Sequence, residues 1–474
     1  MSYRPPSGVW RLALTAGAFL FLGPTAAHAA VQVGGALSTA PLERLRSAVG
    51  LATLVAIAWA LSTDRRRISW RVVVWGLALQ LGLALLILKT SVGAGVFDAA
   101  GTVVVGLLGY TRDGAAFVFG NLVYDTIPVG STTVGQGGFE AMPDQVAQVG
   151  ASFAFFVLPT IIFFSALMTV LYHLGIMQRL VGAFAWAMQR TMGTSGAETL
   201  SAAGNIFVGQ TEAPLLVKPF VDRMTTSELM TVMTAGFATV AGGVMAAYVG
   251  MLIGAFPDVA GHLVAASVMS APAALVVAKV MVPETEVPET ASTLQIVVER
   301  TDVNVIDAAA RGASEGLHLA LNVGAMLLAF VALIHLCNGV LGWAGGLAGF
   351  PGLSLEAVLG WVLAPLAWLM GVPWADAGTV GSLLGIKTIL NEFVAYLQLA
   401  GLIRGEGVLE PRSVVIATYA LSGFANFGSI AIQIGGLSGI APNRRQDLSR
   451  LGLRAMIGGS IAAFMTASVA GMIL

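Results

Sequence analysis

The chain has 474 residues, of which 57% are hydrophobic and only 10% are charged, and its formal net charge is −1. Soluble domains carry about 25% charged residues, so this composition excludes a large soluble domain and predicts an all-α protein that crosses a membrane several times. The balanced charge gives no reason to expect a nucleic-acid partner. The single cysteine, Cys337, excludes an internal disulfide. It lies in an apolar run, which predicts a packed thiol.

The first 29 residues form a candidate secretory signal. Arg4 and Arg11 precede the apolar run 12–22, and residues 27–29 read Ala-His-Ala, a small-x-small cleavage site. Cleavage would leave Ala30 as the first residue of the mature chain. The alternative is an uncleaved first transmembrane helix, for which the run is short.

About eight further stretches are long and apolar enough to span a bilayer. We expect them at 44–62, 70–89, 150–172, 228–255, 258–282, 319–345, 411–434 and 455–474. Basic clusters at 65–71 and 444–454 prefer the cytoplasmic side of a membrane. This predicts an inner-membrane, multi-pass protein whose N- and C-termini lie on the periplasmic side, an orientation that a cleaved signal would also give.

The segments between these spans are less regular. Residues 95–123 predict an interfacial helix and loop, 124–149 an external loop, and 305–318 an amphipathic helix at the membrane interface. The expected organisation is a signal peptide at 1–29, N-terminal spans with an interfacial helix (mostly scaffold) at 30–190, a first hairpin and its following spans at 191–282, a surface linker and interfacial helix at 283–318, scaffold spans at 319–370, and a second hairpin with the C-terminal spans at 371–474.

Two apolar segments are interrupted by acidic and helix-breaking residues. Gly209 and Pro214 flank Glu212 in the first, and Glu392 lies in the second. Each segment is followed by a span that contains Gly-Phe-Ala, at 236–238 and at 423–425. Paired broken segments are typical of secondary transporters built from inverted repeats, with the site at the repeat interface. Chance similarity between Gly- and Ala-rich spans is the alternative.

The polar side chains in these segments suit an uncharged solute with several hydrogen-bonding groups. A carboxylate in hydrocarbon costs at least about 2.5 kcal/mol, so an acidic residue there indicates a polar site. Carboxylates, amides and hydroxyls match sugar hydroxyls and the edge of a heterocycle, and Phe424 or Phe427 can pack on a flat ring. Asn426 and Ser429 have an alternative role as interhelical hydrogen bonds. Lys387 is expected to be the ion partner of a carboxylate.

At these residues the sequence resembles the concentrative nucleoside transporter family. The signature Gly-x-Lys-x-x-x-Asn-Glu-Phe-Val-Ala-Tyr is complete from Gly385 to Tyr396. Residues 209–215 (Gly-Gln-Thr-Glu-Ala-Pro-Leu) and 423–429 (Gly-Phe-Ala-Asn-Phe-x-Ser) match the family's two other blocks. The resemblance extends over residues 45–474. It implies a homotrimer of eight-span protomers, each with interfacial helices, two re-entrant hairpins and a transport domain that moves like an elevator past a scaffold.

The resemblance also implies a set of ligands. The nucleoside-binding residues would be Gln210, Thr211, Glu212 and Val244 around the base, Glu392, Asn426 and Ser429 at the ribose, and Phe424 packing on the nucleoside. The sodium ligands would be the side chains of Asn205 and Thr239 and the backbone carbonyls of Val208 and Val240. Position 239 is Ser in some members, position 428 is Gly where others carry Ser, and some proton-coupled members read Gly-Gln-Ser-Glu in the first block. These comparisons favour sodium over protons.

The expected function is therefore secondary active import of nucleosides by cation symport, with Na+ (or H+) as the coupling ion, no other cofactor and no enzymatic activity. Two alternatives remain at this point. Residues 193–196 read Gly-Thr-Ser-Gly, so an intramembrane serine protease would use Ser195, with His335 as its base. The second alternative is a passive channel for small polar solutes.

Overall fold

The computed structural model describes residues 39–124, 126–132, 139–148, 153–291, 302–350, 352–405 and 409–474. The candidate signal at 1–29 lies outside these residues. Most of the described chain is helical, with one two-stranded sheet. The elements are α2 (Pro41–Ala60), η1 (Arg65–Arg67), α3 (Trp70–Lys89), α4 (Ser91–Phe119), η2 (Gly120–Val123), β1 (Thr126–Thr132), β2 (Phe139–Gln148), η3 (Phe153–Val157), α5 (Leu158–His173), α6 (Ile176–Met192), α7 (Gly196–Gly204), η4 (Ala213–Val217), α8 (Lys218–Val221), α9 (Thr226–Ala238), α10 (Gly242–Leu252), α11 (Val259–Met281), α12 (Val305–Leu347), α13 (Leu355–Met370), α14 (Trp374–Ile389), α15 (Glu392–Arg404), α16 (Pro411–Leu421), α17 (Phe427–Ile440), η5 (Pro442–Arg444) and α18 (Arg445–Ile473).

The helices support the expected membrane protein. Among the described residues, 7 helical stretches are long and apolar enough to cross a membrane, or up to 8 if the bent pair α13–α14 counts as one span. Helices α3, α5, α11 and α18 coincide with expected spans. Helix α2 covers the expected stretch 44–62 but is not among the 7.

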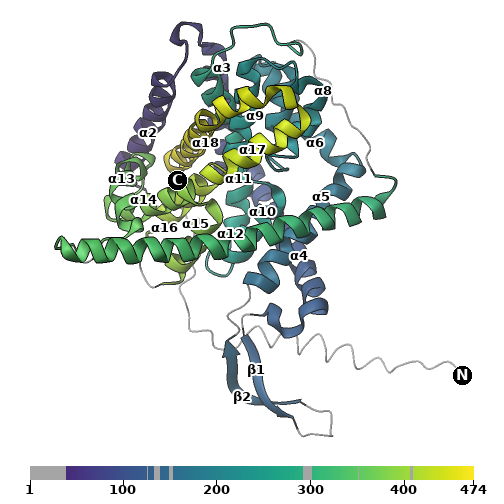
Figure 1. Ribbon diagram of the computed structural model, residues 1–474, viewed down its shortest axis with the longest axis vertical. Coiled ribbons are helices and arrows are strands. Elements are labelled where there is room, and N and C mark those ends of the chain that lie inside the picture. The colour runs from purple at the N-terminus through teal and green to yellow at the C-terminus, as the bar shows by residue number, and fades with distance from the viewer. Residues whose placement is uncertain are drawn as a thin grey trace, which may run out of the picture.

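Three of the less regular segments have more regular secondary structure than expected. Residues 95–123 belong to α4, which continues into η2 as a candidate span of 33 residues. The expected loop at 124–149 contains β1 and β2, an antiparallel pair that projects from the helical body (Figure 1). The interfacial helix at 305–318 and the span at 319–345 are one helix, α12, of 43 residues, which crosses the face of the molecule. At 1.5 Å per residue α12 is about 65 Å long, more than twice the hydrocarbon thickness of a bilayer. Cys337 is exposed on α12 and is not packed as expected.

Two expected spans are broken in the middle. The stretch 228–255 divides into α9 and α10 around Thr239–Ala241, and 411–434 divides into α16 and α17 around Ser422–Asn426. Gly423 has a φ of +134°, and a Cβ there would lie 2.8 Å from Phe237 O. Only glycine fits this close approach, so the two breaks are packed against each other.

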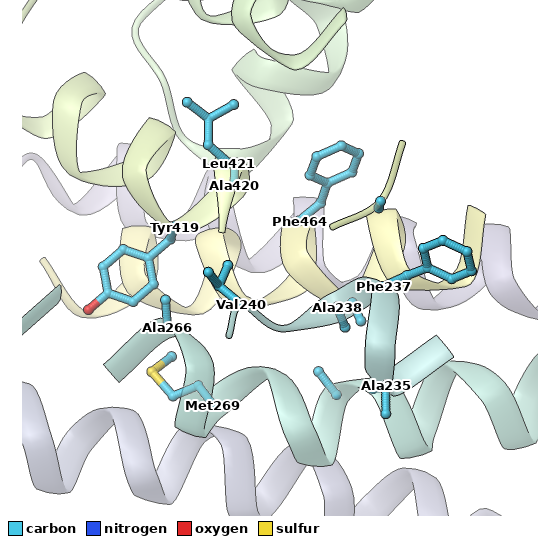
Figure 2. Packing of buried hydrophobic residues seen from close by; sticks show 14 of the residues in the cluster. Ala235, Phe237, Ala238, Val240, Ala266, Met269, Tyr419, Ala420, Leu421 and Phe464 are labelled. Atoms are coloured by element: carbon cyan, nitrogen blue, oxygen red, sulfur yellow. The ribbon is translucent and has the colours of Figure 1, made fainter. Parts of the chain in front are cut away.

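The broken helices lie in the most buried part of the molecule. Helices α11 and α18 have 94% and 83% of their most apolar windows buried, against 17% for α12. Figure 2 shows the core around the ends of α9 and α16, with Phe237, Ala238 and Val240 from one chain segment and Tyr419, Ala420 and Leu421 from the other.

The two acidic segments are interrupted where the sequence predicted. Residues 205–212 separate α7 from η4, which begins with Ala213-Pro214. Helices α14 and α15 are separated by Leu390 and Asn391, and the Asn391 side chain accepts the Val394 N–H at 3.0 Å as the N-cap of α15. Each interruption therefore leaves helix ends, with their unpaired backbone groups, inside the protein.

Candidate functional site

Glu392 is the centre of the first polar cluster. Its side chain is only 4% exposed at the N-terminus of α15. The Tyr248 hydroxyl donates to Glu392 Oε1 at 2.9 Å, and Asn426 Nδ2 donates to Oε2 at 2.9 Å. Asn426 is also the N-cap of α17, where its Oδ1 accepts the Ser429 N–H at 2.8 Å. One buried carboxylate thus joins α10, α15 and the break before α17.

A second polar cluster lies further along α17. Gln210 Nε2 donates to Ser429 Oγ at 3.3 Å, and Gln433 Nε2 donates to Gln210 Oε1 at 3.0 Å. Gln433 Nε2 also lies 3.1 Å from Met233 O on α9. Ser429 is therefore close to both clusters, because its backbone is capped by Asn426 and its hydroxyl accepts from Gln210.

Thr211, the next residue of the first block, also packs on α17. A Cβ at Gly436 would lie 3.1 Å from Thr211 Cγ2. Gly436 is 10 residues after Asn426, about 15 Å along the helix axis at 1.5 Å per residue. Glu212 is exposed, and its Oε2 lies directly over Gly209. No hydrogen bond joins Glu212 and Glu392 among the described residues.

The apolar residues expected at the site differ in how deeply they are buried. Val244 is buried on α10, one turn before Tyr248, and Phe424 is half-buried in the break before α17. Phe427 is 52% exposed and is therefore not part of the buried clusters. Of the two phenylalanines considered for ring packing, only Phe424 has a suitable position.

The four candidate sodium ligands come from two breaks that touch. Asn205 and Val208 lie in the break after α7, and Thr239 and Val240 lie in the break after α9. The Gly242 N–H donates to Phe207 O at 3.0 Å and ties the two breaks together. Asn205 Nδ2 is bonded to Ser201 O, but the buried Asn205 Oδ1 has no hydrogen-bond partner among the described residues. The Thr239 hydroxyl donates to Ala235 O at 2.9 Å, which leaves its lone pairs free.

This donor set fits a hard monovalent cation. It consists of neutral oxygen atoms, which hard cations prefer to nitrogen and sulfur. The described residues contain no group of three or more His, Cys, Asp or Glu suited to a transition metal. The buried Asn205 Oδ1, without a hydrogen-bond partner among the described residues, is the observation that points to an ion.

Lys387 and Ser195 are the two remaining candidates from the sequence. Lys387 is fully buried, and its Nζ donates to Ala420 O at 2.8 Å at the end of α16. It also interacts electrostatically with Glu392, without a direct ion pair among the described residues. Ser195 is the N-cap of α7: its hydroxyl caps the Glu198 N–H and donates to Glu228. His335 is exposed on α12, so the serine of the protease alternative has a structural role and its proposed base lies on the surface.

Tyr248 and Gln433 were missed from the sequence. Gln433 follows Ser429 by four residues, and Asn426, Ser429 and Gln433 form one polar stripe on an otherwise apolar helix. That spacing was a usable signal. Tyr248 carried no comparable signal, because a tyrosine in an apolar helix is ordinarily a packing residue.

Two cavities lie outside these clusters. One, of about 580 Å³, is bounded by α13, α14 and α15 and includes Glu356 and Gln398. The other, of about 520 Å³, lies between α17 and α18 and includes Ser438 and Arg445. Neither is lined by Gln210 or Glu392.

Comparison with family models decides the relationship of this chain to known proteins. Residues 262–471 match the model described as Na+ dependent nucleoside transporter C-terminus, and residues 49–122 match its N-terminal counterpart. Residues 154–255 match a model named Gate and described as nucleoside recognition. The chain belongs to the concentrative nucleoside transporter family. It is therefore a multi-pass membrane transporter of the nucleoside class and not an enzyme, which removes the protease alternative.

Relatives cover nearly the whole chain. An uncharacterized transporter of Haemophilus influenzae is 46% identical over 433 residues, which are 91% of this chain and 98% of that protein. Solute carrier family 28 member 3 of Rattus norvegicus is 44% identical, and the match takes in 92% of this chain but 60% of that longer protein.

Solved structures of this family have the same fold. The structure of CNTnw in an inward-facing substrate-bound state is 45% identical to this chain, with a TM-score of 0.79, and the match covers 90% of this chain and 97% of that one. A CNTnw variant in an outward-facing state is 44% identical, with a TM-score of 0.81 over 91% of this chain and 98% of that one. This fold is thus known in both inward-facing and outward-facing states.

Proposed function

We propose that this protein imports nucleosides across the inner membrane by symport with sodium. The observation that carries the proposal is the buried Glu392 carboxylate, held by Tyr248 and Asn426 where α10, α15 and the break before α17 meet. Buried ionisable groups in membrane helices ordinarily mark a substrate or ion pathway. Relatives include the sodium/nucleoside cotransporter 1 of Rattus norvegicus, 42% identical over 444 residues. Coupling to protons is the second candidate.

We assign the ribose end of the site to Glu392, Asn426 and Ser429. A carboxylate accepts hydrogen bonds from two vicinal hydroxyls, and an amide supplies both a donor and an acceptor. We assign the base to the side chains of Gln210, Thr211, Glu212 and Val244, with Phe424 packing on the nucleoside. The polar stripe of α17 supports this order, because it runs from Asn426 beside Glu392 to Gln433 beside Gln210.

We assign the cation to Asn205 and Thr239 and to the carbonyls of Val208 and Val240. The break that holds Asn205 continues directly into Gln210, so an ion that orders this backbone also orders the base-binding residues. Linkage then requires that sodium raises nucleoside affinity and that the nucleoside raises sodium affinity by the same factor. This coupling is what turns a sodium gradient into uphill nucleoside import.

The wider assembly follows from the same proposal. The two interrupted segments would be re-entrant hairpins of a transport domain, comprising 191–282 and 371–474, that moves like an elevator past a scaffold. The protein would be a homotrimer with both termini on the periplasmic side and with residues 1–29 removed as a signal peptide. The exposed apolar side chains of α12, which include Leu328, Leu336 and Trp343, support contact with lipid or with another protomer.

Uptake into proteoliposomes tests the proposal. Labelled uridine or adenosine should accumulate above the external concentration with an inward sodium gradient, and not when choline replaces sodium. A passive channel would equilibrate the nucleoside without accumulating it. Glu392→Gln should abolish accumulation, while the matched control Glu356→Gln, an acid that accepts from Asn338 Nδ2 away from the site, should retain it. Accumulation that survives Glu392→Gln would remove this carboxylate from the site.

A further inference from the structure

Gln433 has a fixed amide orientation. It is 1% exposed, and its Nε2 donates both to Met233 O and to Gln210 Oε1. A backbone carbonyl can only accept, so the amide nitrogen of Gln433 must face Met233. The same nitrogen then requires that Gln210 presents its oxygen to Gln433. Gln210 Nε2 is consequently turned toward Ser429 Oγ.

The orientation leaves one acceptor without a partner. Gln433 Oε1 is buried and has no hydrogen bond among the described residues. Buried polar atoms are nearly always hydrogen-bonded, and each exception calls for an explanation. Gln210 Nε2 in turn has two hydrogens, of which the bond to Ser429 uses one. The two amides, joined by a hydrogen bond of 3.0 Å, together therefore offer one acceptor and one donor hydrogen without a partner among the described residues.

Gly236 makes this arrangement possible. A Cβ at position 236 would lie 2.6 Å from Gln433 Nε2 and 2.9 Å from Gln210 Cβ. Any larger residue at position 236 would therefore displace Gln433 and Gln210. Three separate elements, α9, the break after α7, and α17, meet at this point only because one of them lacks a side chain.

We propose that Gln433 is a specificity residue for the base: it fixes the polarity of the Gln210 amide and offers its Oε1 to an exocyclic amine of the nucleobase. This inference rests on the proposed function. An amine next to an unprotonated ring nitrogen presents a donor beside an acceptor, the complement of Gln433 Oε1 beside Gln210 Nε2. Cytosine and adenine have this edge, and their analogues without the amine lack the donor.

The test compares matched nucleosides that differ only in that amine. The pairs are cytidine with its 4-deamino analogue and adenosine with purine riboside, measured as dissociation constants on detergent-purified protein in sodium and as KM values in proteoliposomes. Wild-type protein should bind the amino member of each pair about tenfold more tightly, because the analogue without the amine leaves the buried Gln433 Oε1 unpaired. Gln433→Met should reduce this preference to within about twofold. Gln398→Met, the same substitution on α15 at the edge of a separate cavity, should keep the full preference.

Two results would overturn the inference. One is an unchanged preference in Gln433→Met, and the other is equal weakening of both members of each pair, which a structural role would produce. If Gln433→Met does not fold, Gly236→Ala serves instead, because it retains every polar group but displaces the Gln433 amide and should narrow the preference. The binding ratio does not depend on transport. A wild-type protein that binds nucleosides selectively without accumulating them would contradict the proposed function and leave the role of Gln433 supported.

Discussion

The Tyr248 hydroxyl lies 2.9 Å from Glu392 Oε1, although 144 residues separate them in the chain. The same tyrosine ring stacks on Tyr396 at a centroid distance of 4.4 Å. Helix α10 thus fixes the position of the carboxylate that we assign to the ribose. A second donor, Asn426 Nδ2 at the N-cap of α17, holds the other oxygen.

Tyr248→Phe should weaken nucleoside affinity without unfolding the protein. The substitution removes one hydrogen bond to a buried carboxylate, a loss of about 1.5–3 kcal/mol, and keeps the aromatic ring. We expect KM for uridine to rise at least about tenfold. Tyr396→Phe is the matched control, since its hydroxyl donates to Thr418 O and not to Glu392. Equal KM values for the two variants would contradict the role given to Tyr248.

Thr239→Val should shift the sodium dependence of uptake. The variant keeps the shape of the side chain but removes the hydroxyl that we assign to the cation, so half-maximal uptake should require at least about fivefold more sodium. Nucleoside affinity should fall at low sodium and recover at high sodium, because the coupling is reciprocal.

Thr231→Val provides the comparison for Thr239→Val. Thr231 lies on α9 and is buried, as Thr239 is. Each threonine hydroxyl donates to the carbonyl four residues earlier, at 2.9 Å. Removal of the Thr231 hydroxyl should leave the sodium dependence unchanged. A shift of the same size in both variants would assign the effect to helix packing and not to cation binding.

Gly423→Ala should damage the protein severely. The residue has a φ of +134°, and the added Cβ would lie 2.8 Å from Phe237 O and 3.0 Å from Ala238 O. Backbone atoms cannot move aside as a flexible side chain can, so the two breaks would separate. We expect a lower thermal unfolding temperature and loss of uptake. Gly435→Ala on α17, where a Cβ would meet nothing within 4 Å, should be tolerated.

Lys279→Met should destabilise the fold through buried charge. Lys279 Nζ lies 2.7 Å from Glu198 Oε2 and 3.2 Å from Glu284 Oε2, and its side chain is 7% exposed. Loss of one partner of a buried ion pair costs about 3–5 kcal/mol, because the other charge stays buried. Thermal unfolding in detergent measures the effect. Arg311→Met breaks an ion pair with Asp302 on a side chain that is 42% exposed, and should cost no more than about 1 kcal/mol.

The polar stripe of α17 illustrates how far the sequence could predict the site. Gln210, Glu392 and Asn426 were identifiable because each lies in a short, otherwise apolar segment, and burial of a polar group there is a local property of the sequence. Gln433 met the same criterion and was missed. Tyr248 did not meet it, since its role depends on Glu392 being within hydrogen-bond distance.

Helix α12 and Lys387 illustrate the opposite case. The change from amphipathic to apolar pattern near residue 318 suggested two elements, but residues 305–347 contain no proline, and the helix continues through the change. Lys387 was expected beside a carboxylate because a buried charge needs a partner. Lys387 does interact electrostatically with Glu392, but it also donates to the carbonyl of Ala420, 33 residues away, at a helix end whose position no local pattern gives.

By itself, the sequence determined that this protein crosses a membrane, where most of its apolar stretches lie and which two acidic segments are interrupted, because hydrophobicity and helix breaking act over a few neighbouring residues. Only the tertiary structure decided which atoms those interruptions bring together. Hydrogen bonds such as Gln433 to Gln210, across 223 residues, depend on how the broken helices pack, and packing is a property of the whole chain.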